Sequence, residues 1–452
     1  MDILKDIALS PSIDHYQLIL CIAALSAVVL VPYLAFALGS AIFAMRYEAK
    51  GKREKDAAVL EAAYDSLQVP FANKHVMVFL GLLPALILVL AQAQMLKSTS
   101  ALSVDLSAAG FVLIAAGLIL LAFYTYTFRL QDVLASYRSM LGAQKGSEEK
   151  TKAIGIYEKS NSAAHQRAGS WGIAALALGA FLFSAAEAVT ADPSQWQSIE
   201  SIVDVFLNPG VWIKFFVFCS IVPGMTALGL SFFFSLEKEK TYKNLYTAEI
   251  IRRLVRWSAA SLIVLPIVLL ANIAAVPPAA VSGMLYSLAG LALVLFFAAA
   301  HFVYGFYRTG ERQAASLAFF LFLFAVGVTV AGEYTGIGTA TRAQAAALSV
   351  SYEKEMETLE AKYGTAEVSF TGEDIYNARC SACHLFDQKK VGPPYFETVP
   401  KYNKNKSQLA AFILNPQKKN PDYPSMPNQG LRQDEADSIA AYLILKVAQA
   451  GR

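Results

Sequence analysis

Long apolar stretches separated by shorter polar ones run through the first three quarters of the chain. A helix needs about 20 mainly apolar residues to cross the hydrocarbon core of a bilayer. Pro223 and Pro266 are interpreted as kinks inside two such helices, because apolar sequence continues on both sides of each. The pattern predicts an all-α membrane domain over residues 1–335 with eight transmembrane helices. These are expected at residues 16–45, 76–96, 108–127, 168–189, 211–236, 257–276, 281–306 and 314–330.

The composition agrees with a membrane protein, since 56% of the 452 residues are hydrophobic and 16% are charged. The net charge of +3 matters less than its distribution. Basic residues gather in alternate loops, whereas the intervening loops hold Lys97 and otherwise mainly acidic residues. Loops rich in Lys and Arg stay in the cytoplasm. We therefore expect the odd-numbered loops inside and both termini outside. The basic loops lie within residues 46–74, 129–167, 238–256 and 308–312.

Polar sequence replaces apolar sequence after residue 335. Residues 341–362 are rich in Ala, Glu and Lys, a composition that favours a solvent-exposed helix, and Gly364 is expected to end it. We interpret residues 336–366 as a linker helix. Residues 367–452 are then long enough for one small soluble domain.

Cys380, Cys383 and His384 form a C-x-x-C-H motif, the spacing by which haem is attached covalently to protein. The two thiols add across the haem vinyl groups, and the imidazole that follows binds the iron. A redox-active dithiol or half of a zinc site are the alternatives, but the sequence has no second Cys pair. The motif predicts one covalent haem c. An even number of helices places it in the periplasm, where bacterial c-type haem is attached.

The segments around the motif carry a family resemblance. Gly372, Ile375 and Tyr376 precede it at helical spacing, and a second helix with an acidic first turn is expected at 433–447. Together with the C-x-x-C-H motif, these features resemble a class I cytochrome c domain, which would cover residues 367–452.

This resemblance implies the remaining contacts of the haem. Met426, in the loop before the last helix, would be the second axial ligand of the iron. At Pro393 a backbone carbonyl would accept the Nδ1–H of the proximal His and fix its tautomer. The rings of Tyr395, Phe396 and Tyr402 would wall the haem.

A haem held by both His and Met has no open coordination site for oxygen or substrate. The domain is therefore expected to carry electrons without performing catalysis. Its charges between the motif and the last helix are mostly positive, which would suit docking of an acidic soluble periplasmic carrier or would simply form a solvated surface. The basic residues are Lys389, Lys390, Lys401, Lys404, Lys406, Lys418 and Lys419.

Ionisable residues inside membrane helices are costly and therefore candidates for function. Glu187 lies in the outer half of the fourth helix, where it would handle a proton or a quinol or form an interfacial pair. His301, in the seventh helix, would ligate a b-type haem together with His75, or would be a hydrogen-bonded histidine. Glu333 is placed just beyond the eighth helix.

The membrane domain also contains a motif, Asn208-Pro209-Gly210 followed by Lys214-Phe215, which resembles subunit I of cytochrome bd-type oxidases. In that family, a His shortly after the Lys-Phe pair and another in the first helix bind haem. Here residues 216–219 are Phe-Val-Phe-Cys, and Ala27 stands in the first helix. The resemblance therefore implies a degenerate subunit beside a haem-bearing partner subunit.

The features together predict an electron-transfer subunit of a respiratory oxidoreductase in a bacterial inner membrane, in a complex similar to bd-type oxidases. Two other functions stay open: a quinol-binding module that reduces its own cytochrome, and a membrane scaffold with a tethered electron shuttle. The expected cofactor is one covalent haem c, with haem b or a quinone as further candidates. The expected partners are membrane lipid, haem-bearing subunits and a soluble carrier, without nucleic acid.

Overall fold

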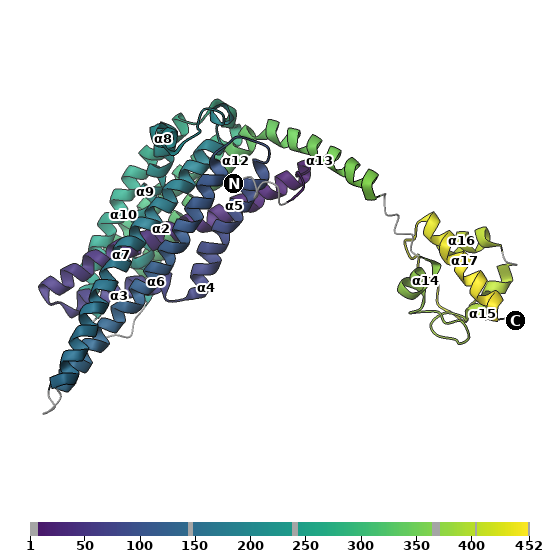
Figure 1. Ribbon diagram of the computed structural model, residues 1–452, viewed down its shortest axis with the longest axis horizontal. Coiled ribbons are helices and arrows are strands. Elements are labelled where there is room, and N and C mark those ends of the chain that lie inside the picture. Colours follow the sequence, from purple (N-terminus) through teal and green to yellow (C-terminus); the bar gives the residue numbers. More distant parts are fainter. Residues whose placement is uncertain (1–7, 143–147, 237–242, 364–370, 403–404, 451–452) are drawn as a thin grey trace. The chain divides into compact units, whose positions relative to one another are not determined.

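The computed structural model describes residues 8–142, 148–236, 243–363, 371–402 and 405–450 (Figure 1). Every regular element in these ranges is a helix. The chain divides into two compact units, Met1–Glu355 and Met356–Arg452. The predicted all-α fold class is confirmed.

The first unit contains eight helices that are long and apolar enough to cross a membrane, counted over the described residues. This confirms the predicted number. Pro223 lies inside α9 and Pro266 inside α10, as expected. The spanning helices are α2 (Ile13–Glu54), α4 and α5 (Lys74–Val76 and Leu83–Met95, joined by the π-helical turn Met77–Leu82), α6 (Ser103–Gly142), α7 (Glu148–Thr190), α9 (Pro209–Leu236), α10 (Lys243–Ala274), α11 (Gly283–Thr309) and α12 (Arg312–Ala340).

Helix α2 forms the centre of this unit, since it packs against α5, α7, α9 and α12. Its inward positions are small: Ala27, Ala37 and Ala41 are completely buried. Small residues let helix backbones approach closely, which drives association where lipid and core are equally apolar. Around α2, the sequential helices pair as α6 with α7, α9 with α10 and α11 with α12.

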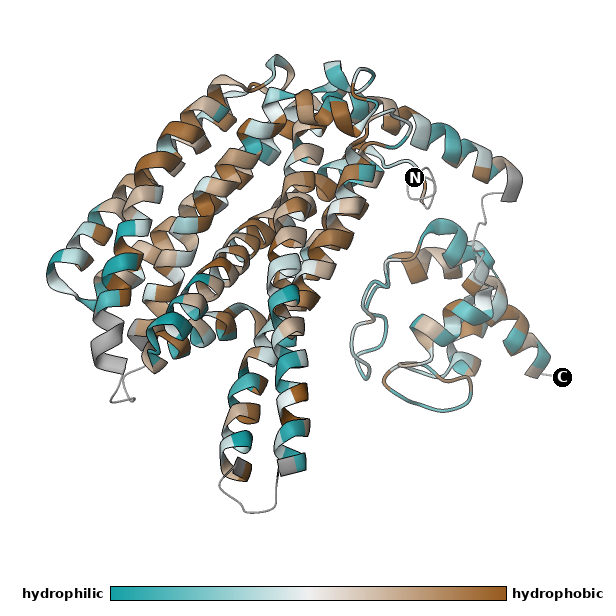
Figure 2. Cartoon of the chain, turned by 60° about the vertical axis from the view of Figure 1, so that its left-hand side comes forward, coloured by the Kyte–Doolittle hydropathy of each residue, from teal (hydrophilic) through white to brown (hydrophobic). Residues whose placement is uncertain are grey.

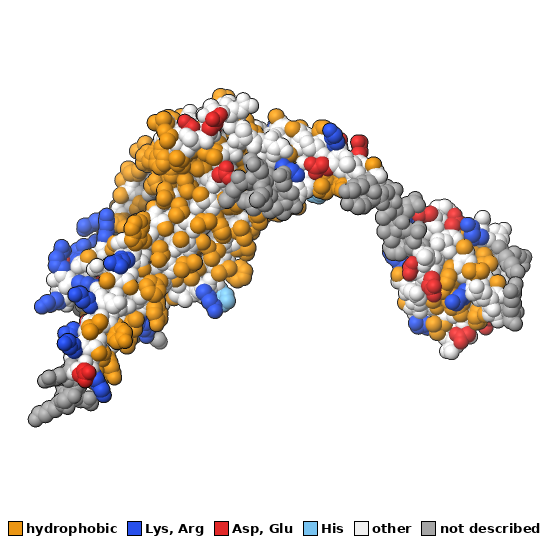
Figure 3. All heavy atoms as spheres, viewed as in Figure 1, with side chains coloured by type: hydrophobic (Ala, Val, Ile, Leu, Met, Phe, Trp, Pro, Cys, Tyr) orange, Lys and Arg blue, Asp and Glu red, His pale blue; other side chains and the backbone are white. Residues whose placement is uncertain are grey.

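The surface of the first unit has an apolar belt and two different ends. Its long helices are hydrophobic over their middle parts and hydrophilic towards their ends (Figure 2). Lys and Arg side chains gather at the end that includes α3 (Ala57–Phe71), whereas acidic side chains are visible at the end near α8 (Ile202–Leu207) (Figure 3). This distribution matches the loop asymmetry in the sequence.

Several helices extend beyond the apolar stretches that predict them. Helix α6 continues to Gly142 and α7 begins at Glu148, so much of the longest predicted loop is a helical hairpin. Helix α12 runs to Ala340, ten residues past its predicted end. Glu333 therefore lies inside a membrane helix, not beyond it, and this corrects the sequence-based placement.

In the second unit, short helices surround a small core. They are α14 (Gly372–Ile375) with the π-helical turn Tyr376–Cys380, α15 (Tyr395–Thr398) with the 3₁₀ turn Val399–Tyr402, α16 (Lys406–Leu414) and α17 (Gln433–Ala450). Helix α13 (Arg342–Tyr363) precedes them and spans the division between the units. Gly372 permits the crossing of α14 on α17, because a Cβ there would collide with the Ser438 carbonyl and with Tyr442.

Candidate functional site

A single tight turn presents the C-x-x-C-H motif. The amide of Ser381 donates to the Tyr376 carbonyl at 2.8 Å, which closes the π-helical turn. Amides at the end of the motif donate back to the carbonyl of its first residue, Cys380. The nitrogen of His384 lies 2.9 Å from this carbonyl. These bonds hold two thiols and one imidazole within a few residues, so all three can reach one cofactor.

The imidazole of His384 is oriented by its surroundings. Its Nδ1 lies 2.9 Å from the backbone carbonyl of Pro393, as the cytochrome c resemblance implies. The ring also stacks on Tyr395, with centroids 5.0 Å apart. Because Nδ1–H donates to a carbonyl, Nε2 is the nitrogen left to bind a metal.

His384, Cys380 and Met426 line one cavity of about 620 Å³ in this unit. A smaller cavity of about 80 Å³ is lined by the same three residues and also by Cys383. The larger volume lies within the range of roughly 300–1,000 Å³ typical of ligand pockets. The structure thus gathers all four predicted haem-binding side chains around one space.

Aromatic side chains form much of the wall of the larger cavity. Tyr395, Tyr402 and Phe412 line it, whereas Phe396 does not and instead packs against Phe386. Burial raises the pKa of the Cys380 thiol, and burial followed by the neighbouring Cys380 raises the pKa of Tyr395. Both groups are therefore neutral near pH 7, which suits a cavity for a largely apolar macrocycle.

Four of the predicted lysines line the same cavity: Lys389, Lys401, Lys418 and Lys419. The ammonium of Lys419 lies 4.8 Å from the ring centroid of Tyr402, and that of Lys389 lies 4.7 Å from the ring centroid of Tyr423. Lys404 lies outside the described residues. Glu397 and Asp422 also line this cavity, so its charged side chains are mainly positive.

The residues present fit a haem c. Around this space lie two thiols, an imidazole with Nε2 available and a thioether. These groups are the donor set of a six-coordinate c-type haem. The close approach of Gly392 to the His384 ring supports this fit, because a Cβ at Gly392 would collide with the ring. The chain therefore has a glycine where the imidazole needs space.

Replacing Gly392 by alanine is expected to displace the His384 ring, since the new Cβ would lie 2.6 Å from both ring nitrogens. Thioether attachment does not depend on this ring, so haem content should persist. The low-spin features of the optical and electron paramagnetic resonance spectra should disappear for most of the protein. Leu445→Ala is the control, because Leu445 is 60% exposed and lines neither cavity. Unchanged spectra in Gly392→Ala would show that the imidazole is not held as described.

In the membrane unit, Glu187 is brought next to other ionisable side chains. Its carboxylate accepts a hydrogen bond from Tyr334 Oη at 3.2 Å. Together with Lys214 and Glu333, it lines a cavity of about 50 Å³. Sequence reasoning named Glu187 but did not foresee that Lys214 and Glu333 pair beside it, 3.4 Å apart.

His75 and His301 do not meet in the described part of the structure. Both are exposed. Helix α11, which carries His301, packs mainly on α12 and α10, whereas α5, which follows His75, packs on α2 and α6. The ring of His301 contacts Phe302. The arrangement offers no support for a bis-histidine haem b.

His165 is a buried residue that the sequence analysis left unassigned. Its Nε2 lies 3.1 Å from both carboxylate oxygens of Glu48, and its Nδ1 lies 2.9 Å from Thr127 Oγ1. Tyr124 stacks on the imidazole and donates to Glu48 at 2.7 Å. The signal in the sequence was Glu48, an acidic residue near the end of the first apolar helix, but its buried partners Tyr124 and His165 lie more than 70 residues away.

Comparison with known proteins bears on the second unit. Residues 370–443 match the family model described as Cytochrome C oxidase, cbb3-type, subunit III. No curated protein matches the chain. The matched range contains the C-x-x-C-H turn, Pro393 and Met426. A cytochrome c domain implies haem c and electron transfer. This chain is therefore a multi-pass membrane protein with a C-terminal cytochrome c domain.

Proposed function

We propose that the chain is an electron-transfer subunit of a respiratory membrane oxidoreductase. One haem c would be attached to Cys380 and Cys383, with His384 and Met426 as axial ligands. The observation that carries the proposal comes from a domain matched to a cytochrome c oxidase subunit: Cys380, His384 and Met426 line the cavity of about 620 Å³, and the same three residues and Cys383 line the smaller cavity beside it.

The protein's residues would hold and insulate this group. The haem supplies one-electron transfer between ferric and ferrous iron. Pro393 fixes the His384 tautomer through the 2.9 Å hydrogen bond, and Tyr395 packs on the imidazole. With His384 and Met426 as its axial ligands, the iron would have no open site for substrate, so this domain would carry electrons without performing catalysis.

The proposed location is a bacterial inner membrane with both termini and the cytochrome domain in the periplasm. Support comes from the basic end of the membrane unit, which the positive-inside rule assigns to the cytoplasm. Helix α12 runs from Arg312 at the basic end to Ala340 at the other end, so in this orientation α13 would start on the outer side. Soluble periplasmic carriers would then reach the haem domain, whose lysines favour an acidic partner.

We further propose a partner subunit in a complex similar to bd-type oxidases. The Asn208-Pro209-Gly210 motif at the start of α9 supports this assignment. Where that family has haem-binding histidines, this chain has apolar residues, among them the buried Ala27 and Val217. Val217 lines a cavity of about 50 Å³, far below what a haem requires. Membrane haems would therefore belong to the partner.

Purification from native membranes with haem typing tests this assignment. We expect haem c within this chain and co-purification of a second subunit that carries haem b or d. Haem b or d in the isolated chain would contradict the degenerate-subunit assignment. Purification of the chain alone with haem c would favour the quinol-binding or scaffold alternatives.

Met426→Ala is expected to remove the methionine-to-iron charge-transfer band in the red region and to lower the reduction potential. Methionine ligation raises the potential of cytochromes c, and axial ligands set haem potentials over a range of about 0.8 V. Redox titration of the purified chain measures the shift. The control is Met356→Ala, since Met356 lies on α13 and does not line the cavity. A native band in Met426→Ala would exclude this residue as ligand.

A second candidate function is a quinol-binding module within the membrane unit. One observation favours it over a plain scaffold: a cavity of about 290 Å³ among the membrane helices, lined by Lys214 and Glu333. A scaffold has no need for a mostly apolar cavity with converging charged groups.

A further inference from the structure

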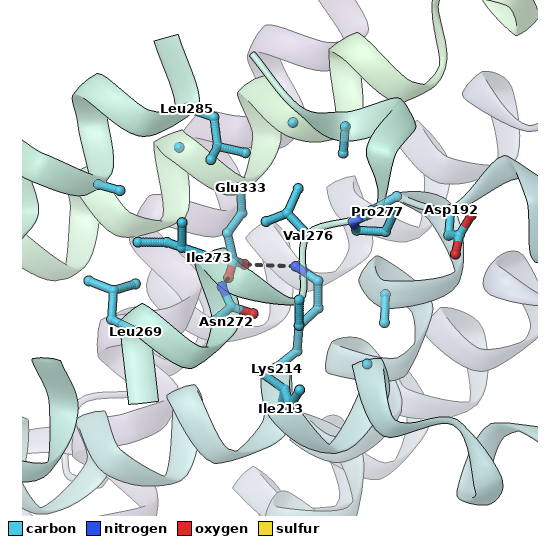
Figure 4. A pocket seen from close by; sticks show the side chains of 18 of the residues that line it. Asp192, Ile213, Lys214, Leu269, Asn272, Ile273, Val276, Pro277, Leu285 and Glu333 are labelled. Carbon is cyan, nitrogen blue, oxygen red and sulfur yellow. Dashed lines mark hydrogen bonds and ion pairs between the residues drawn. The ribbon is translucent and has the colours of Figure 1, made fainter. Parts of the chain in front are cut away.

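The larger cavity of the membrane unit lies where five helices meet. The end of α7, the start of α9, the end of α10, the start of α11 and the last part of α12 contribute to it. Apolar side chains such as Leu269, Ile273, Val276 and Leu285 surround Lys214 and Glu333 (Figure 4). Two of the lining residues, Val276 and Pro277, belong to the short connection between α10 and α11. The cavity is thus apolar with a few placed polar groups, as in most small-molecule sites.

Three polar side chains from three helices converge on this space. Lys214 Nζ lies 3.4 Å from Glu333 Oε2, and Asn272 Nδ2 donates to Glu333 Oε1 at 3.2 Å. The side chains of Lys214 and Glu333 are 15% and 16% exposed, so they are neither fully buried in the core nor exposed to lipid. Lys214 is the sixth residue of α9, which places it roughly 7 Å below the start of the helix.

The polar groups favour a neutral ligand over a charged one. Lys214 is the one cation among the described residues that line the cavity, whereas two carboxylates, Glu333 and Asp192, line it. Glu187 lines the adjoining smaller cavity together with Lys214 and Glu333. An anionic phosphate headgroup would meet this excess of carboxylates, and a cation would meet Lys214. A neutral ring with oxygens at opposite ends fits both the apolar walls and the donor–acceptor pair.

We propose that this cavity binds the headgroup of a quinone or quinol. The inference rests on the second function proposed above and names its site. Lys214 donates a hydrogen bond to a ring oxygen, and Glu333 accepts one from the hydroxyl of the reduced form. Asn272 orients the Glu333 carboxylate. Glu187, held by Tyr334, is a second carboxylate next to this pair.

Equilibrium binding tests the site without using electron transfer. Quinone-depleted full-length protein in detergent is titrated with 2-heptyl-4-hydroxyquinoline N-oxide, a fluorescent quinol analogue, and the probe is displaced with decylubiquinone. We expect one saturable site. Lys214→Met and Glu333→Gln should each weaken binding about tenfold or more, because each removes a hydrogen bond to a charged group.

A third variant fills the cavity and keeps the ion pair. Gly332 lines the cavity, and an added Cβ would lie 3.5 Å from the Cβ of Leu288, so Gly332→Leu extends into the open space. It should also weaken binding about tenfold or more, and it decides the question if a charge variant fails to fold. Gly290→Leu is its matched control, because Gly290 on α11 is exposed with no atom within 4 Å of its added Cβ. Lys97→Met is the control for Lys214→Met.

Wild-type affinity in all three variants, or displacement by phosphatidylglycerol but not by decylubiquinone, would overturn the site. Haem c content of the same preparation tests the electron-transfer function separately. A haem-loaded chain that fails to bind the probe overturns this inference alone. A chain that binds the probe without haem leaves the site standing and contradicts the assignment of Cys380 and Cys383.

Discussion

Replacing both Cys380 and Cys383 by serine is expected to lower covalently bound haem at least about tenfold, because both thioether bonds are lost. Haem staining after denaturing electrophoresis measures it, since only covalent haem survives that treatment. The matched control is Cys21→Ser/Cys219→Ser, which changes the two cysteines of membrane helices α2 and α9. That control should keep full staining.

The same double variant should also lose stability in its cytochrome domain. Without haem, the cavity of about 620 Å³ remains unfilled among the core residues of this small unit. A domain that folds around a cofactor loses the binding free energy when the cofactor is absent. Limited proteolysis should therefore cleave residues 371–450 faster than in the control. Unchanged haem staining in the double variant would contradict the covalent attachment.

The elements that sequence reasoning predicted correctly depend on local patterns. Each of the eight membrane helices follows from a continuous apolar stretch, because a bilayer demands about 20 such residues in sequence. The haem-binding turn follows from the three residues of one motif, Cys380, Cys383 and His384. The position of Met426 came from the family resemblance, and the structure places it on the same cavity.

The membrane site could not be predicted in this way because it depends on tertiary packing. Lys214 and Glu333 are 119 residues apart and meet only because α9 packs on α12. Glu333 was placed outside the membrane since the apolar run ends near Val330. Helix α12 continues to Ala340, and Gly336 lets it pack closely against α11, since a Cβ there would lie 2.9 Å from Leu285 Cδ1. Composition alone gave no sign of that packing.

Glu48→Leu is expected to destabilise the membrane unit by about 2–6 kcal/mol, because two buried polar groups lose their acceptor at a cost of about 1–3 kcal/mol each. Glu48 is 7% exposed and His165 is fully buried. The carboxylate accepts from Tyr124 at 2.7 Å and from Lys52, and it faces His165 Nε2 at 3.1 Å. Leucine would leave the imidazole and the Tyr124 hydroxyl without their acceptor, and α2, α6 and α7 would lose their shared contact.

Thermal unfolding in detergent, followed by size-exclusion chromatography, should show a midpoint lower by roughly 5–10 °C. Glu54→Leu is the matched control, because Glu54 lies on the same helix and pairs with Lys50 at an exposed position. The double variant Glu48→Leu/His165→Leu should lose less stability than the sum of its single variants, since the buried imidazole of His165 is no longer left without its acceptor. Additive losses would show that Glu48 and His165 act independently, and the 3.1 Å contact would then contribute nothing to the packing of α2 on α7.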